Sequence, residues 1–315
     1  MNANPLPKWL TRLVEHLPLN PAGHSLLRKP VWRFAALALA VLIFAGGAWW
    51  SFSGLAISPS DLRPGPLAIL ALLMIPSLLY GGLGLVLLAR SSGFSMPLGK
   101  ATVIGAYAYL AEMLPLPGGA IVRAGALVKE GAGVKRSSAL VILTAILWVS
   151  LGMLGAGIAL WHQGLQLALP LLLAGLAFVL AITTWLWASA GPALAIQTLL
   201  HRMAGIALIA VRLQFAFAAL HAPAALSAMF PFVLASLLGS ASSIAPAGLG
   251  ISESLAALVA TTVEFSPGTA FLAVGIDRLF SLLACACTAL IPHLRLRARP
   301  ALGGNATSKT PGNLR

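Results

Sequence analysis

The sequence predicts an all-α polytopic membrane protein. Of its 315 residues 59% are hydrophobic and 9% are charged, and the mean hydropathy is +0.94, which leaves too little polar surface for a water-soluble fold. Several apolar windows reach the roughly 20 residues that a helix needs to cross a bilayer core of about 30 Å. None has the alternating pattern of a barrel strand. We therefore expect one transmembrane domain over residues 33–292, with about six full transmembrane helices and two re-entrant helix pairs.

The two terminal segments differ from this domain in composition. Residues 1–32 contain "LPKWLTRLVEHL", which places Trp9, Leu13 and Leu17 on one helix face and predicts an interfacial amphipathic helix. The first apolar run follows only after residue 32 and has no small-residue cleavage site, so we expect a retained span rather than a removed signal peptide. Residues 293–315 are basic and poor in apolar residues, which predicts a disordered cytoplasmic tail.

Six apolar segments are predicted to span the membrane: 33–52, 67–89, 139–161, 165–187, 204–221 and 268–291. With these bounds sixteen of the twenty Lys and Arg residues, Arg202 among them, fall at one membrane face, and only Arg63 falls at the other. This positive-inside asymmetry predicts an inner-membrane protein with both termini in the cytoplasm. Nucleic-acid binding accounts less well for the net charge of +13, because no stacking aromatics alternate with these charges on a polar face.

Two further apolar segments, 98–128 and 224–263, are interrupted by helix breakers. Basic residues flank the first segment on both sides, so both of its ends should lie in the cytoplasm, yet about 30 residues are too few for two crossings. The second segment must begin and end on the outer face, because the spans around it do. We therefore predict two re-entrant helix pairs that enter from opposite faces. The breakers are Pro115, Pro117, Gly118 and Gly119 in the first segment, and Pro246, Gly248 and Gly250 in the second.

This order of elements predicts an inverted repeat. A span, a re-entrant pair and a span recur as repeat one, residues 67–161, and repeat two, residues 204–291. The span at 165–187 lies between them and would invert the second copy. Inverted repeats with broken helices at corresponding positions indicate a transport site near the bilayer midplane. The alternative is a simple bundle in which the prolines only kink their helices.

Charged residues within apolar sequence are the candidate site residues, because each costs at least about 2.5–3.5 kcal/mol to insert. They are Glu112, Arg123, Arg212, Glu253, Asp277 and Arg278. Glu253 should lie in the first turn of a half-helix, where it either caps that helix or pairs with Arg278 near mid-depth. Asp277 either holds the Arg278 guanidinium or faces water.

The remaining charged candidates also have two interpretations each. Arg123 follows the first break, where it either grips a phosphate headgroup beside free helix amides or reaches the cytoplasmic interface. Glu112 either pairs with Arg123 or lines water at the re-entrant tip. Arg212 requires an acid or a water-filled cavity, and no partner is evident near it in the sequence.

Signatures of enzymes, cofactors and metal sites are missing from the sequence. It contains no GxSxG, Walker or HExxH motif and no cluster of metal-ligand residues. Of the six histidines, His162, His201 and His221 flank predicted spans, and we expect them at the membrane interface. These observations predict a protein that is not an enzyme and needs no cofactor.

Two stretches resemble a known family. "LPLPGGAIVRAGALVKEGAGVKRSSA" (114–139) and "APAGLGISESLAALVATTVEFSPGTAFLAVGIDRL" (245–279) resemble the transmembrane, flippase-like region of lysylphosphatidylglycerol synthases and their stand-alone relatives, and the likeness covers about residues 30–292. It implies a protein that moves a polar, aminoacylated or phosphate-bearing lipid between leaflets, without the soluble synthase domain. One departure is "VILTAILWVS" (141–150), which lacks the acid and arginine pair that family members tend to carry there.

Two other functions stay open at this point. The chain could be a membrane scaffold or accessory subunit of a lipid- or glycan-modifying enzyme, in which case its charges would serve assembly. It could also be an integral-membrane transferase acting on a lipid carrier, although no acid or base pair in the sequence has a recognisable catalytic spacing.

Overall fold

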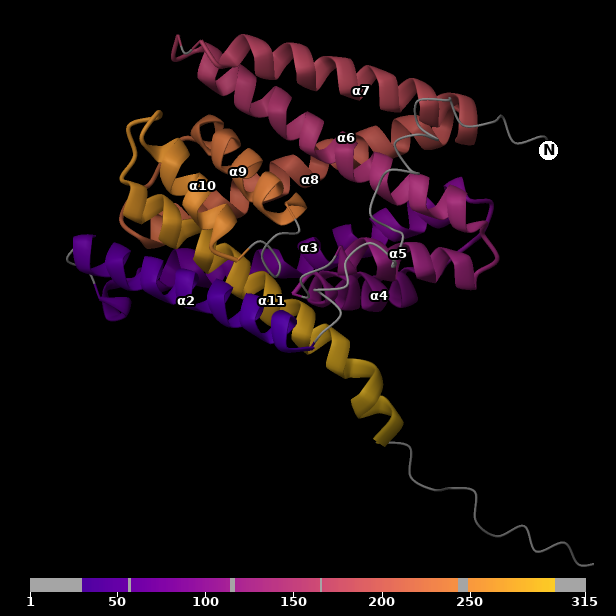
Figure 1. The fold of residues 1–315 in the computed structure, drawn as a ribbon, viewed down its shortest axis with the longest axis horizontal. Helices are drawn as coiled ribbons and strands as arrows, with labels where there is room; N and C mark the ends of the chain where they lie inside the picture. Colours follow the sequence, from indigo (N-terminus) through magenta and orange to yellow (C-terminus); the bar gives the residue numbers. More distant parts are fainter. Residues whose placement is uncertain (1–29, 56–57, 114–116, 165, 243–248, 298–315) are drawn as a thin grey trace, which may run out of the picture.

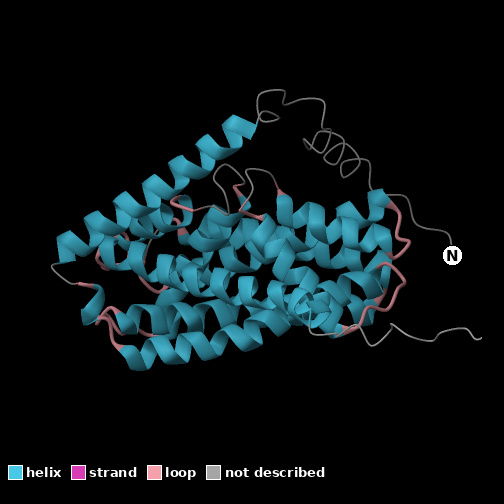
Figure 2. Cartoon of the chain, turned by 90° about the horizontal axis from the view of Figure 1, so that it is seen from below, coloured by secondary structure: helices cyan, strands magenta, loops and turns pink. Residues whose placement is uncertain are grey.

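The structure is a computed structural model and describes residues 30–55, 58–113, 117–164, 166–242 and 249–297. Within these ranges the chain consists of helices and connecting loops, with no strand (Figure 2). The predicted interfacial helix at the N-terminus and most of the predicted C-terminal tail lie outside the described residues.

Ten α-helices make up the described fold (Figure 1). They are α2 (Pro30–Leu55), α3 (Pro64–Ser91), α4 (Leu98–Ala111), α5 (Gly118–Lys129), α6 (Val134–Trp161), α7 (Ala168–Ala190), α8 (Pro192–Ala219), α9 (Phe230–Ala241), α10 (Ile251–Ala260) and α11 (Pro267–Arg297), with 3-10 turns η1 (Pro59–Asp61) and η2 (Leu226–Met229). Five of them, namely α3, α6, α7, α8 and the part of α11 up to Ile291, are long and apolar enough to cross a membrane. The predicted fold class, an all-α multi-pass membrane protein, is confirmed.

Two helix boundaries differ most from the predicted spans. Helix α8 begins at Pro192 rather than at residue 204. Gly191, with a φ of 91°, ends α7, and Pro192 starts α8 at once, since glycine tolerates positive φ and proline suits the first helical position. Helix α11 also continues to Arg297, into the segment predicted as a disordered tail.

The first broken segment is a helical hairpin, because α4 packs directly against α5. The Lys100 Nζ binds the Glu130 Oε1 (2.5 Å), which joins the start of α4 to the end of α5. At the same end of the bundle Arg136, near the start of α6, donates from Nη2 to the carbonyls of Ser91 (2.7 Å) and Ser189 (3.3 Å). The hairpin therefore opens toward the end where α3 and α7 finish and α6 begins.

The second broken segment is also a hairpin, formed by α9 and α10, and it opens toward the opposite end. The Arg63 backbone N–H donates to the Ala219 carbonyl (3.0 Å), which places the start of α3 beside the end of α8. Phe217 of α8 contacts Phe232 of α9 and Phe265, which precedes α11, with ring centroids 4.9 and 5.4 Å apart. The two hairpins thus enter the bundle from opposite ends, as the count of crossings predicts.

The contacts between helices are paired as a two-fold repeat would pair them. If α2–α6 and α7–α11 are two copies of one unit, α2 corresponds to α7, α3 to α8, α4 to α9 and α6 to α11. The contacts follow this correspondence: α4 packs on α11 and α9 packs on α6, while α2 packs on α11 and α7 packs on α6. Helix α3 packs on its own counterpart, α8. We predicted α7 as a spacer between two repeats, yet it lies against α6 as α2 lies against α11 (Figure 1). The pairing favours repeat units of α2–α6 and α7–α11, larger than the predicted 67–161 and 204–291.

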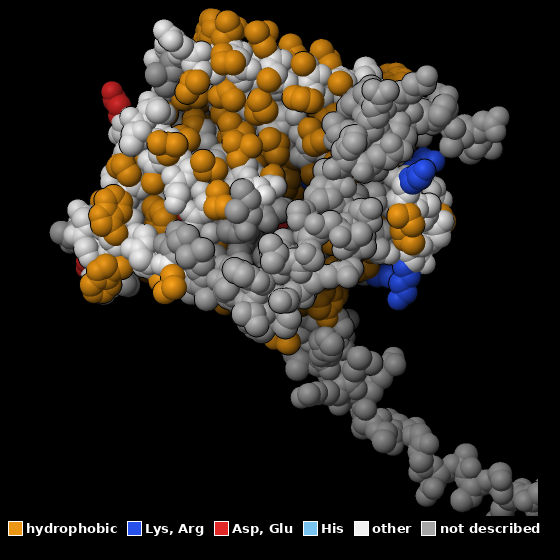
Figure 3. All heavy atoms as spheres, in the orientation of Figure 1, with side chains coloured by type: hydrophobic (Ala, Val, Ile, Leu, Met, Phe, Trp, Pro, Cys, Tyr) orange, Lys and Arg blue, Asp and Glu red, His pale blue; other side chains and the backbone are white. Residues whose placement is uncertain are grey.

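Large hydrophobic side chains cover the outside of the bundle. Leu72 of α3, Leu173 and Leu180 of α7 and Leu258 of α10 are all more than half exposed. Figure 3 shows such side chains spread across the part of the molecule where Figure 1 places α6 and α7. An outer surface this rich in exposed apolar side chains suits contact with lipid rather than water.

Gly239 allows the close packing of the second hairpin, and replacing it should destabilise the fold. A Cβ at this position would lie 2.6 Å from the backbone nitrogen of Ser252 in α10, and closer still to the Ser252 side chain. We expect Gly239→Ala to cost about 1–3 kcal/mol because α10 must shift. The midpoint of thermal unfolding in detergent measures this.

Gly81→Ala is the matched control, because a Cβ there meets no atom within 4 Å. It should leave the midpoint unchanged or raise it slightly, since alanine favours a helix interior over glycine by about 0.5–1 kcal/mol. Equal midpoints for the two variants would contradict the close-packing explanation.

Candidate functional site

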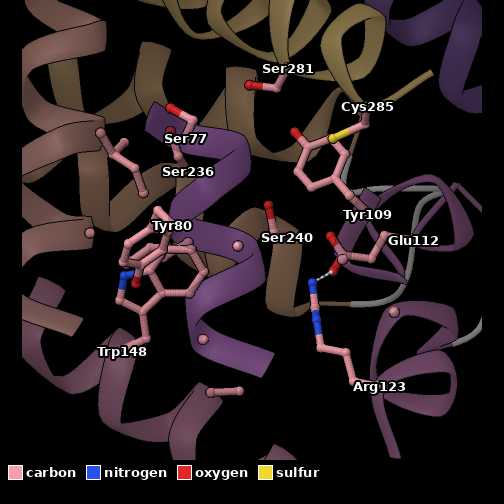
Figure 4. Close-up of a pocket in the computed structure, with 18 of the residues that line it drawn as sticks. Ser77, Tyr80, Tyr109, Glu112, Arg123, Trp148, Ser236, Ser240, Ser281 and Cys285 are labelled. Atoms are coloured by element: carbon pink, nitrogen blue, oxygen red, sulfur yellow. Dashed lines mark hydrogen bonds and ion pairs between the residues drawn. The ribbon is translucent and has the colours of Figure 1, made fainter. Parts of the chain in front are cut away.

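A cavity of about 420 Å³ lies among α3, α4, α5, α6, α8, α9 and α11. Both hairpin tips reach it: Glu112, Pro117 and Gly119 line it from the first hairpin, and Ser240 and Ala241 line it from the second (Figure 4). Five of the six predicted charged residues also line this cavity, and the sixth, Glu253, contacts one of them. Residues that are far apart in the sequence thus meet around one space.

Arg212 of α8 and Asp277 of α11 form a bidentate ion pair. The Arg212 Nε and Nη2 donate to the two Asp277 carboxylate oxygens at 2.8 and 2.7 Å, and both side chains are 11% exposed. The guanidinium also donates to the hydroxyls of Ser77 (3.3 Å) and Ser281 (2.5 Å). Asp277 therefore holds Arg212, not Arg278 as one interpretation of the sequence had it. The pair joins residues 65 positions apart, too far for a local sequence pattern to predict.

Glu253 is fully buried and uses its two carboxylate oxygens for different partners. Its Oε2 accepts from the backbone N–H of Gly250 at 2.8 Å and so caps α10. Its Oε1 lies 3.5 Å from the Arg278 Nη1. Arg278 also donates from Nη2 to the hydroxyls of Ser240 (3.1 Å) and Ser252 (2.5 Å). Glu253 is therefore both a helix cap and an ion-pair partner.

This second ion pair keeps unused hydrogen-bonding capacity. Among the described residues neither the Glu253 Oε1 nor the Arg278 Nη1 has a hydrogen-bond partner, so their 3.5 Å approach is a charge contact rather than a hydrogen bond. Arg278 is only 6% exposed, yet it forms part of the cavity wall. Arg278 thus joins the buried Glu253 to the wall of the cavity.

Glu112 and Arg123 form the ion pair at the tip of the first hairpin (Figure 4). The Arg123 Nη2 donates to the Glu112 Oε1 at 3.1 Å, and the two side chains are 33% and 25% exposed. The Glu112 Oε1 occupies the space that a side chain on Gly119 would need. Glu112 thus lies over the start of α5, much as Glu253 caps the start of α10. Each hairpin tip combines an acid at a helix start with an arginine bound to it.

The cavity wall also includes residues that were not predicted as site residues, among them Tyr80, Trp148, His201 and Arg202. The Tyr80 ring stacks on His201 with centroids 4.0 Å apart and lies 6.0 Å from Trp148, and the Arg202 Cζ is 5.3 Å from the Trp148 ring centroid. The sequence predicts His201 and Arg202 at the membrane face just before a span, whereas α8 begins at Pro192 and both residues lie within this helix and line the cavity. The Gly-Pro pair at 191–192 was the signal that could have shown the earlier start.

The predicted helix breakers are described only in part. Pro117 precedes α5, Gly118 and Gly119 begin it, and Gly250 precedes α10 with a φ of 81°. Pro115, Pro246 and Gly248 lie outside the described residues. In the described part of the chain no group of three or more His, Cys, Asp and Glu residues could hold a metal ion.

The chain matches no protein-family model and no curated protein sequence.

Replacing Glu253 with glutamine separates its two roles. The amide oxygen can still accept from the Gly250 N–H, but the buried Arg278 charge loses its counter-charge. Breaking a buried ion pair from one side costs about 3–5 kcal/mol. We expect Glu253→Gln to lower the thermal midpoint strongly, and the double variant Glu253→Gln/Arg278→Gln to lose less than the sum of the single losses.

Glu112→Gln is the matched control, because its ion pair is partly exposed and such pairs contribute only about 0–1 kcal/mol. If Glu253→Gln and Glu112→Gln were equally mild, the buried ion pair would not be needed for stability.

Proposed function

We propose that this protein is a flippase-like transporter that moves a phosphate-bearing lipid between the leaflets of the inner membrane, without an enzymatic step. The observation that carries the proposal is the shared cavity: two hairpins enter a multi-pass bundle from opposite ends, and both tips meet a single space lined by arginines. Such a site is open in principle to each end in turn, which alternating access requires.

The charge of the cavity favours an anionic headgroup. Arg123, Arg202, Arg212 and Arg278 line it, against Glu112 and Asp277 on the wall and Glu253 behind Arg278. One positive charge is left without a counter-charge. A lipid phosphate would meet attraction, whereas the cationic headgroup of a lysyl-lipid would meet repulsion. Among the headgroups that the family resemblance implies, this charge balance favours the phosphate-bearing one.

The pairing of most cavity arginines with carboxylates also suits transport of a headgroup rather than its tight binding. Three of the four are already paired with carboxylates, so a headgroup exchanges one set of hydrogen bonds for another as it passes. A transported group must bind well enough to enter and weakly enough to leave. Its acyl chains would stay in the lipid that surrounds the apolar outer surface.

The basic end of the bundle would face the cytoplasm in this proposal. Lys100 and Arg136 lie at the end where the first hairpin opens, and an excess of such residues marks the cytoplasmic side. The first hairpin tip would then enter from the cytoplasm and the second from the outside, with both termini cytoplasmic.

Reconstitution into vesicles tests the proposal. Phosphatidylglycerol with a fluorescent label on one acyl chain should exchange between leaflets faster in vesicles with the protein than in empty ones. Arg123→Gln should slow the exchange about tenfold or more, since a charge-assisted hydrogen bond to the headgroup is worth about 1.5–3 kcal/mol.

Lys100→Gln supplies the matched control, because Lys100 is half-exposed, pairs with Glu130 outside the cavity and should change the rate little. If the protein accelerated no polar lipid over empty vesicles, the proposed function would be wrong.

A further inference from the structure

Arg202 differs from the other arginines of the cavity wall. Arg123, Arg212 and Arg278 each lie within 4 Å of a carboxylate, whereas among the described residues Arg202 has no such partner. It lies ten residues beyond Pro192, or about 15 Å along α8 at 1.5 Å per residue. An uncompensated charge inside a membrane helix is expensive and therefore points to a function.

The polar atoms around Arg202 lack hydrogen-bond partners too. The Arg202 Nε, the Trp148 Nε1 and the His201 Nε2 are buried, and none of them has a partner in the described structure. Arginine Nε and indole Nε1 can only donate, and imidazole Nε2 can donate in one tautomer or when protonated. Each unsatisfied buried group costs about 1–3 kcal/mol. The Tyr80 hydroxyl is also buried without a partner among the described residues, and it can donate or accept. The cluster thus has several donors and one positive charge, but no carboxylate to balance that charge.

The cluster is built into the packing of α3, α6 and α8. Its Tyr80 ring contacts the rings of both His201 and Trp148, and Arg202 covers the Trp148 ring. A Cβ on Gly205 would collide with the Tyr80 ring, and one on Gly84 would lie 3.0 Å from the His201 Nε2. The two glycines therefore make room for this stack, which holds the donors in place before any ligand arrives.

We propose that Arg202, Trp148 and His201 form a phosphate subsite, which binds an oxyanion carried by the transported lipid. This inference rests on the proposed function and specifies where the headgroup binds. An oxyanion supplies several acceptors and a negative charge, so it satisfies both deficits of the cluster at once. Water could accept the hydrogen bonds but would not compensate the charge. In Figure 4 Tyr80 and Trp148 lie across the view from the Glu112–Arg123 pair, so the subsite is separate from the hairpin tip.

Binding to the purified full-length protein in a neutral detergent tests this subsite. The probes are dioctanoyl phosphatidylglycerol, dioctanoylglycerol, which has the same acyl chains without the phosphate, and inorganic phosphate. We expect phosphatidylglycerol to bind at least tenfold more tightly than dioctanoylglycerol. Arg202→Gln should weaken phosphatidylglycerol binding about tenfold or more, and Trp148→Phe, which removes the Nε1–H donor and keeps a smaller aromatic ring, should weaken it severalfold.

Two variants outside the cavity are matched controls. Arg90→Gln removes an exposed charge at the end of α3, and Trp187→Phe changes an indole that is 53% exposed on α7. Both should bind like the unmodified protein. Thermal unfolding shows which variants fold. If Arg202→Gln does not fold, the test uses Trp148→Phe and Arg202→Lys instead. Arg202→Lys keeps the positive charge but removes the Nε–H donor.

The outcomes separate the subsite from the transport proposal. If inorganic phosphate competes with phosphatidylglycerol, the oxyanion alone is sufficient for binding. If inorganic phosphate does not compete, the site requires a lipid headgroup. Both results support the subsite. Unchanged phosphatidylglycerol affinity in folded Arg202→Gln and Trp148→Phe would overturn it, even if vesicles showed transport. Arg202-dependent binding without transport would instead leave the subsite standing and remove the proposed function.

Discussion

Two adjacent residues of α11, Asp277 and Arg278, determine how the centre of the bundle is arranged. Asp277 binds Arg212 of α8, and Arg278 contacts Glu253 at the start of α10. Because isolated charges in hydrocarbon are costly, each of these residues constrains the helix that carries its partner. Consecutive residues of a helix point about 100° apart, so one short stretch of α11 ties together helices on two of its sides.

The hairpins contribute the other half of the arrangement. Helix α5 can begin close to the end of α4 because Gly118 and Gly119 leave room for Ala111 and Glu112, and α10 approaches α9 at Gly239. These contacts bring polar residues to the tips, where they meet α11. Short helices ending inside a membrane expose backbone groups that need partners. Glu253 supplies one directly, through the N–H of Gly250.

Local sequence patterns predicted the fold class and the hairpins but not the pairing of charges. Apolar length predicted the long helices, and the breakers at 115–119 and 246–250 fall in the sequence where one helix of each hairpin gives way to the next, with Gly118 and Gly119 opening α5. The Glu253–Arg278 contact could be anticipated, because the sequence places Glu253 in the first turn of a half-helix after the second break and Arg278 near the middle of the last span. Arg212 and Asp277 could not be paired, since nothing in one sequence relates positions on α8 and α11. The place of Arg202 within α8 was not predicted, because the apolar window ignored the Gly-Pro signal that starts α8 at Pro192.

The central claim is that an anionic lipid headgroup enters the cavity between the two hairpins. Photo-crosslinking with a phosphatidylglycerol analogue that carries its reactive group on the headgroup tests this most directly, in vesicles containing the full-length protein. The account predicts labelled residues on the cavity faces of α5, α6 and α8, around Arg123, Trp148 and Arg202. Labelling confined to outward-facing positions such as Leu173 and Leu180 of α7 would contradict it.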